Sequence, residues 1–141
     1  MILKVDFRRG DRDDYAQTLS REQREQARAC MAEQATELMK RSPRENLYWI
    51  ENKTDLMELA HVAYMTEMVK DGQGRPYKFA AIAHRLCSVL HVPMPYNPYS
   101  VAYNARTRKG VRQQTFFDRY CWMMYFRKIS NPLNGMIKRM G

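Results

Sequence analysis

The chain of 141 residues lacks the features that would place it at once in a membrane or secreted class. Its longest unbroken apolar run, Tyr120 to Phe126, is seven residues long. A helix that spans a membrane needs about 20. Only three cysteines are present, Cys30, Cys87 and Cys121, and their spacing forms neither a disulfide framework nor a CxxC pair. We therefore expect a cytoplasmic protein that makes no membrane contact.

Glycine and proline are scarce, at six residues each, which excludes collagen-like and low-complexity proteins. The length suits one domain with its own hydrophobic core. Signatures of catalysis are also missing, since the sequence holds no G-x-S-x-G, no P-loop and no dinucleotide fingerprint. Its paired carboxylates gather in a charged segment at 11–37, where no shaped pocket is expected. We therefore predict no enzyme and no cofactor.

Metal-binding patterns are equally weak. His84, Cys87 and His91 follow one another at helical spacing, but a structural zinc site takes four ligands and no nearby fourth is evident. Cys87 also borders an apolar stripe. His61 lies within an apolar helix pattern and is interpreted as a hydrogen-bonded core histidine. No metal site is predicted.

Acidic side chains are scarce in the last third of the chain. The whole sequence has 24 Lys and Arg against 15 Asp and Glu, a net charge of +9. Residues 96–141 carry nine basic and one acidic side chain, which accounts for +8 of that excess. A neutral body with a basic end predicts a surface for a polyanionic partner, and a solvated basic tail is the plainer alternative.

Residues 1–43 are predicted to form an N-terminal part outside the compact body, with a short strand at 2–7, a charged loop and a helix over 20–41. Ser20 and Gln23 fit a capping box that opens this helix, and Ser42-Pro43 ends it. The apolar stripe of the helix is narrow, which suits light packing or a coiled-coil-like partner. Its members are Ala27, Met31, Ala35, Leu38 and Met39.

Residues 44–141 are predicted to form the body, a mainly α, helix–turn–helix-like core with one or two short strands. A strand is expected at 47–51. Asn52 or Thr54 is then expected to cap a helix that runs to about Val69, is apolar nearly all round and is therefore buried. The next helix is expected to begin near Pro76. An aromatic helix begins at Gln113 or Thr115, and a short basic tail follows Asn131-Pro132. The apolar stripe of the helix after Pro76 consists of Phe79, Ile82, Ala83, Leu86 and Leu90.

Asn97-Pro98 predicts the start of one more helix, at about 98–108, with asparagine as the N-cap and proline at the first position. One face, with Tyr99, Ala102 and Tyr103, is expected to pack inward. The opposite face carries side chains that can pair with the edges of bases. The turn before this helix is longer than in the tightest helix–turn–helix units. The predicted base-facing residues are Ser100, Asn104, Thr107 and Arg108, and the predicted phosphate contacts are Arg106, Lys109, Arg112 and Arg119.

Residues 47–122 resemble the C-terminal domain of the RteC family, regulators of excision in conjugative transposons. The resemblance rests on Trp49 before K-T-D-L-x-E-L, on an AAIA-type helix, and on Y-x-x-x-x-N-x-R-x-R-K-G leading into T-x-F-D-R. It implies a winged-helix, DNA-binding transcription regulator of a mobile genetic element. On matching positions it implies contacts by Asn104, Arg106, Arg108 and Lys109. Gly110 is followed by VRQQ, which is not a clear wing hairpin.

Alternatives to DNA binding remain open from the sequence. The chain could be a small helical interaction module whose basic C-terminal third binds an acidic partner or RNA. A homodimer through the helix at 20–41 or the helix at 115–127 is compatible with either function. The aromatic residues around Trp122 could stack the bases of a single strand, although at helical spacing they more often form a core.

Overall fold

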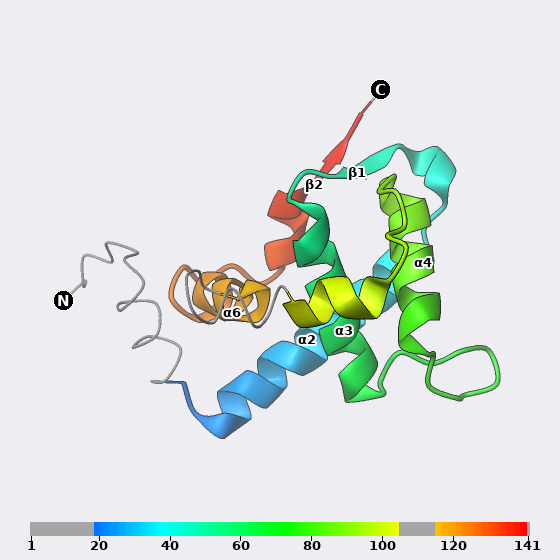
Figure 1. Ribbon diagram of the computed structural model, residues 1–141. Coiled ribbons are helices and arrows are strands. Elements are labelled where there is room, and N and C mark those ends of the chain that lie inside the picture. The colour runs from blue at the N-terminus through cyan, green and yellow to red at the C-terminus, as the bar shows by residue number, and fades with distance from the viewer. Residues whose placement is uncertain (1–18, 105–114, 141) are drawn as a thin grey trace.

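The computed structural model of the chain describes residues 19–104 and 115–140. These form a mainly helical fold with a two-stranded antiparallel sheet at one end (Figure 1), so the predicted mainly α class with short strands is confirmed. The predicted strand at 2–7 lies outside the described residues. Besides helical residues 98–104, the elements in order are α2 (Arg21–Met39), the 3-10 turn η1 (Pro43–Glu45), β1 (Leu47–Trp49), α3 (Lys53–Thr66), α4 (Phe79–Leu90), α6 (Phe116–Tyr125), the 3-10 turn η2 (Pro132–Met136) and β2 (Ile137–Arg139).

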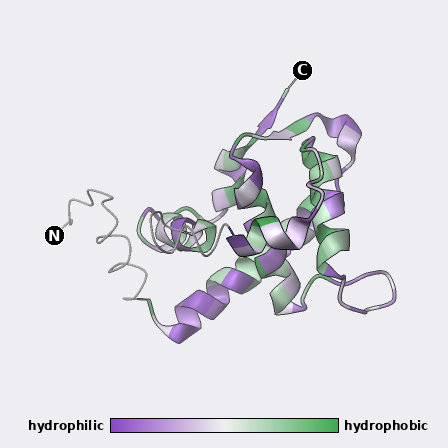
Figure 2. Ribbon diagram, in the orientation of Figure 1, coloured by the Kyte–Doolittle hydropathy of each residue, from purple (hydrophilic) through white to green (hydrophobic). Residues whose placement is uncertain are grey.

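Helix α2 begins with the predicted capping box. The Ser20 hydroxyl accepts a hydrogen bond from the Gln23 amide at 3.0 Å, and the Gln23 side chain accepts one from the Ser20 amide at 2.9 Å. In its narrow stripe Ala27, Met31 and Ala35 are fully buried in the core shared with α3, α4 and α6, and Leu38 and Met39 are half-buried against that core. The opposite face is hydrophilic (Figure 2). Helix α2 therefore packs against the body and is not the expected N-terminal arm, because its small alanines let neighbouring helices approach closely.

Helix α3 buries half of its residues, so it is not buried nearly all round as predicted, and it ends at Thr66 rather than at Val69. Asn52 caps it, with the side-chain oxygen accepting from the Asp55 amide at 2.9 Å. The burial covers the first turns, from Asp55 to Ala60, and includes two carboxylates. Met65 and Met68 near its C-terminal end are 62% and 52% exposed, so that end is not enclosed.

Helix α4 buries all five residues of its predicted stripe. It begins at Phe79, however, and the expectation of a start near Pro76 is wrong. Pro76 instead pairs with Lys70 in an isolated antiparallel bridge. The Asp71 carboxylate accepts from the amides of Gln73 and Arg75 at 2.8 and 3.0 Å, which closes a turn incompatible with helix at this point.

The strands β1 and β2 join distant parts of the chain. Leu47 lies opposite Arg139 and Trp49 lies opposite Ile137. The strand predicted at 47–51 is thus confirmed, but the expected basic tail after Asn131-Pro132 is wrong, because those residues form η2 and β2. Leu133 and Met136 are the buried anchors of this segment.

Helix α6 (Phe116–Tyr125) fits the prediction of a last main helix, but only Phe116 and Tyr120 of its aromatic residues lie in the core, and the others are half-buried. Phe116 and Tyr120 are fully buried, and the Tyr120 hydroxyl donates to the Gln34 side chain of α2 at 3.0 Å. The Tyr125 hydroxyl donates to the Gln23 carbonyl at 2.8 Å. The C-terminal part of α6 is therefore fixed against the N-terminal part of α2.

Candidate nucleic-acid interface

The helix over residues 98–104 starts where its sequence predicts. The Asn97 side chain accepts a hydrogen bond from the Ser100 amide at 3.1 Å, and the Asn97 carbonyl accepts from the Val101 amide at 3.2 Å. Pro98 occupies the first helical position, where its missing N–H has no intrahelical partner to lose. The start of the candidate recognition helix is therefore locally encoded.

This helix rests on the core through its centre. Ala102 is 2% exposed, and the Tyr99 ring lies 4.5 Å from the ring of Phe79, measured between centroids. Partial desolvation, the neighbouring Tyr64 hydroxyl and a hydrogen bond to it raise the pKa of Tyr99. Tyr99 and Tyr103 stay 51% and 63% exposed, so the expectation that both pack inward is wrong. Within residues 98–104 only Ala102 is fully enclosed, Val101 is half-buried against the core, and the two larger rings flank Ala102.

The polar face of the helix points to solvent as predicted. Ser100 and Asn104 are exposed. Together with His61, Tyr99 and Tyr103 they line an open hollow of about 320 Å³. His61 thus borders a surface hollow rather than the interior, and its ring meets Phe79 edge-on at 5.5 Å. The hollow brings hydrogen-bonding groups and flat rings to one place on the surface.

The connection from α4 to this helix, residues 91–97, runs back along α4 (Figure 1). His91 ends α4 in the left-handed conformation with φ 60°, yet Tyr99 contacts Phe79, the first residue of α4. A 12-residue helix is about 18 Å long, and seven extended residues can cover that length. The two helices are therefore joined by a retracing connection and not by a tight turn.

Most of the predicted contact residues lie in the segment 105–114, outside the described residues: Arg106, Thr107, Arg108, Lys109 and Arg112. The two ends of the segment are nevertheless well anchored. On one side Ala102 is buried in the core. On the other, the Glu58 carboxylate of α3 accepts a hydrogen bond from the Phe116 amide at 2.8 Å, and Thr115 caps α6 through the Asp118 amide at 3.1 Å. A segment with four cations and no acid thus connects two fixed points of the surface.

Arg119, also predicted as a phosphate contact, has partners within the body. Its guanidinium lies 2.9 Å from the carboxylate of the fully buried Asp55 and 3.7 Å from that of Glu51. It also lies over the Phe116 ring, 5.5 Å from the centroid. About a third of the Arg119 side chain is exposed. These contacts hold α6 against α3.

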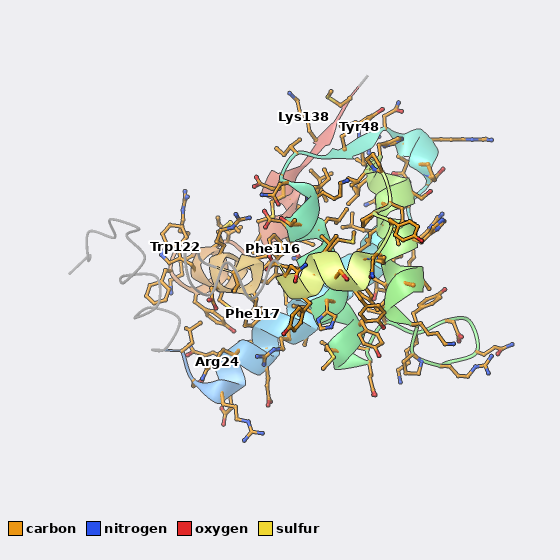
Figure 3. All side chains as sticks on the ribbon, viewed as in Figure 1. Arg24, Tyr48, Phe116, Phe117, Trp122 and Lys138 are labelled. Atoms are coloured by element: carbon orange, nitrogen blue, oxygen red, sulfur yellow. The ribbon has the colours of Figure 1, made fainter. Side chains whose placement is uncertain are left out.

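The anchoring role of Asp55 and Glu58 was not foreseen from the sequence. The signal was present, because two carboxylates three residues apart in an otherwise apolar helix must find partners when buried. Figure 3 shows Phe116 between α6 and the start of α3, where Trp49 also meets it at 6.1 Å between ring centroids. Trp49, Phe116 and the two carboxylates of α3 belong to different parts of the sequence pattern that resembles the RteC family, and they lie close together in space.

The cysteines and histidines form no metal centre in the described part of the chain. Burial raises the pKa of the Cys87 thiol to about 11 and that of Cys121 to about 12, so both are protonated at neutral pH. The His91 ring bonds to the Leu47 carbonyl at 2.9 Å and stacks on Tyr48. Over residues 19–104 and 115–140, no helix is long and apolar enough to cross a bilayer.

Comparisons with protein-family models, with curated proteins and with solved structures gave no match.

Proposed function

We propose that the protein binds duplex DNA, with the helix that begins at residue 98 facing the major groove. In this proposal Ser100, Asn104, Thr107 and Arg108 face base edges. Arg106, Lys109 and Arg112 contact phosphates. The resemblance to the RteC family supports a further role in regulating transcription of a mobile genetic element.

The observation that carries the proposal is the exposed polar face of this helix next to a segment whose charged side chains are all basic. Ser100 and Asn104 are exposed on a helix whose opposite side is anchored by Ala102. The chain then passes directly into residues 105–114, which carry +4. Polar side chains that can select bases, followed at once by cations that can hold phosphates, are the combination that specific duplex binding requires.

Asn104→Ala and Arg108→Ala are expected to weaken binding to a specific duplex by about 1–3 kcal/mol each, because each removes a side chain suited to paired hydrogen bonds with one base. The duplex is first selected by capturing and sequencing sheared genomic DNA. Affinity is then measured by fluorescence anisotropy. Asn134→Ala is the matched control, since Asn134 is also an exposed asparagine but lies in η2. Wild-type affinity in both the Asn104 and Arg108 variants would contradict the proposed reading helix.

Lys109→Ala is expected to act differently, because a phosphate contact carries no sequence information. It should weaken binding to every duplex alike and lower the slope of log affinity against log salt by about one. The measurement is a salt titration with one specific and one scrambled duplex. An effect confined to the specific duplex would show that Lys109 contacts a base instead.

A second candidate function, binding of single-stranded nucleic acid, is favoured by the exposed tyrosines. Tyr96 is fully exposed, and Tyr99 and Tyr103 flank the hollow described above. Such rings stack on unpaired bases with little dependence on sequence. Competition between a duplex and each of its separated strands, and the corresponding RNA, distinguishes the two. Preference for a strand, lost in Tyr103→Ala, would replace the duplex proposal.

A further inference from the structure

A second strongly basic surface lies at the other end of α4 from Tyr99, where four elements meet. Its cations come from the residues after α2, from η1, from α4 and from β2. They are Arg41, Arg44, Arg85, Lys138 and Arg139, and we call this set the basic corner. Lys138 is seen at this end of the molecule in Figure 3.

Hydrogen bonds bring the basic corner together. Arg85 donates to the carbonyls of Met39 and Arg41 at 2.8 and 2.7 Å. It thus supplies hydrogen-bond donors to carbonyls at the C-terminal end of α2, which have none within the helix. Arg139 donates to the Glu45 carbonyl at 3.2 Å. These side-chain bonds to backbone carbonyls fix α4 beside the end of α2 and fix β2 beside η1.

The charges of the basic corner are only partly neutralised. The Glu45 carboxylate is shared by Arg41 at 3.1 Å and Arg139 at 3.8 Å. Five cations around this one shared carboxylate leave a net charge of +4. Nearby Lys40 is matched by Glu37 at 3.7 Å and adds nothing to this excess. Arg44 and Lys138 are exposed, so they are available to an anionic partner.

A flat, partly exposed ring pair lies next to these cations. Tyr48 stacks on His91 with 4.2 Å between centroids and 19° between planes. Lys138 is opposite Tyr48 in the sheet register, and both are visible at the same end in Figure 3. Cations spread around an aromatic surface suit a sugar–phosphate backbone, because arginine pairs with phosphate oxygens and rings pack on sugars.

The distance to the proposed reading helix fits one duplex. Tyr99 contacts the first residue of α4, and the stacked His91 follows its last residue. Helix α4, which separates the two surfaces, is about 18 Å long, and this is less than the rise of one turn of DNA, about 34 Å. We infer that the basic corner binds the phosphates of the same duplex, flanking the part that the helix at 98 reads. This inference rests on the proposed function.

Replacing both Arg44 and Lys138 by glutamine tests the inference and leaves the two ion pairs of Glu45 in place. The readout is the salt dependence of binding to one mixed-sequence DNA duplex. The slope of log affinity against log salt is expected to fall by about two, with the preference between specific and scrambled duplex unchanged.

The matched control is the double variant Arg127→Gln, Lys128→Gln, which removes the same charge directly after α6, beside the opposite end of α2. Arg127 and Lys128 are exposed, and α6 is fixed to that end through the bond from Tyr125 to Gln23. This control should retain the wild-type slope. If the slope falls equally in both double variants, net charge alone explains the effect and the inference is wrong.

Three further results would also overturn the inference. If the Arg44, Lys138 variant keeps the wild-type slope and still binds the duplex tightly, the basic corner does not contact DNA, and the proposed function stands. Absence of duplex binding in the wild type removes both. Vesicles containing phosphatidylserine serve as the other probe, and binding to them that depends on Arg44 and Lys138, without any effect on the duplex, assigns the basic corner to a membrane surface.

Discussion

Met31→Ala is expected to lower the free energy of unfolding by about 2–5 kcal/mol. Met31 is fully buried in the middle of α2, in the core shared with α3, α4 and α6. Shortening it removes apolar contacts and leaves a cavity that rigid neighbouring helices cannot fill completely. Urea unfolding followed by circular dichroism measures the loss. The result decides whether residues 21–39 belong to the body or form an arm.

Met65→Ala is the matched control, because Met65 is 62% exposed at the end of α3. Its replacement should change stability by no more than about 0.5 kcal/mol. If Met31→Ala behaved like this control, α2 would be a separable arm, as its narrow apolar stripe suggests.

Arg119→Met is expected to cost about 2–3 kcal/mol of stability, because it leaves the buried Asp55 carboxylate without its 2.9 Å ion-pair partner. The value is at the low end for broken buried pairs, since about a third of Arg119 is exposed to solvent, which screens the interaction. Methionine keeps the apolar stem of the side chain. The measurement is again denaturant unfolding, combined with a salt titration of duplex binding.

The salt titration separates the two roles of Arg119. A side chain that holds α6 against α3 changes stability without changing the salt slope of binding at temperatures where the variant is folded. A phosphate contact lowers that slope by about one. Arg127→Met serves as the control for stability, because Arg127 is exposed and lies over the Trp122 ring at 5.5 Å. We expect it to cost less than about 1 kcal/mol. Unchanged stability together with a lower salt slope in Arg119→Met would show that Arg119 contacts a phosphate, as the sequence predicts.

Local signals in the sequence predicted the helix starts that have a side-chain cap, but not the start of α4, which has none. Ser20, Asn52, Asn97 and Thr115 each accept a hydrogen bond from a backbone amide in the first turn of a helix. Such caps depend on neighbours within a few residues, so they can be read from sequence. The stripe of α4 was also predicted, because its period is strict and the whole stripe is buried.

Features that depend on distant partners were missed. The strand β2 forms only because β1 offers an edge, and its sequence of Ile137, Lys138 and Arg139 reads as a basic tail. The role of Asp55 depends on Arg119, which follows 64 residues later. The basic corner was hidden for the same reason, since its cations belong to segments that are close together only in the folded chain.

The candidate site was predicted in part. Exposure of Ser100 and Asn104 is confirmed, whereas the expected inward packing of Tyr99 and Tyr103 is wrong. A helical wheel gives the direction of a side chain but not the size of the space beneath it. Here, within residues 98–104, that space fully encloses only Ala102.

The pairing of β1 with β2 has a consequence for the order in which the protein folds. Leu47 and Arg139 are neighbours in space but are separated by nearly the whole body in sequence. Contacts of such separation carry a large loop-closure cost, and a sheet of two short strands is marginal alone. We therefore expect the sheet to form after the helices have packed. On the ribosome, the edge of β1 stays open until residues 137–139 emerge, and mutations in β2 should change the unfolding rate rather than the folding rate.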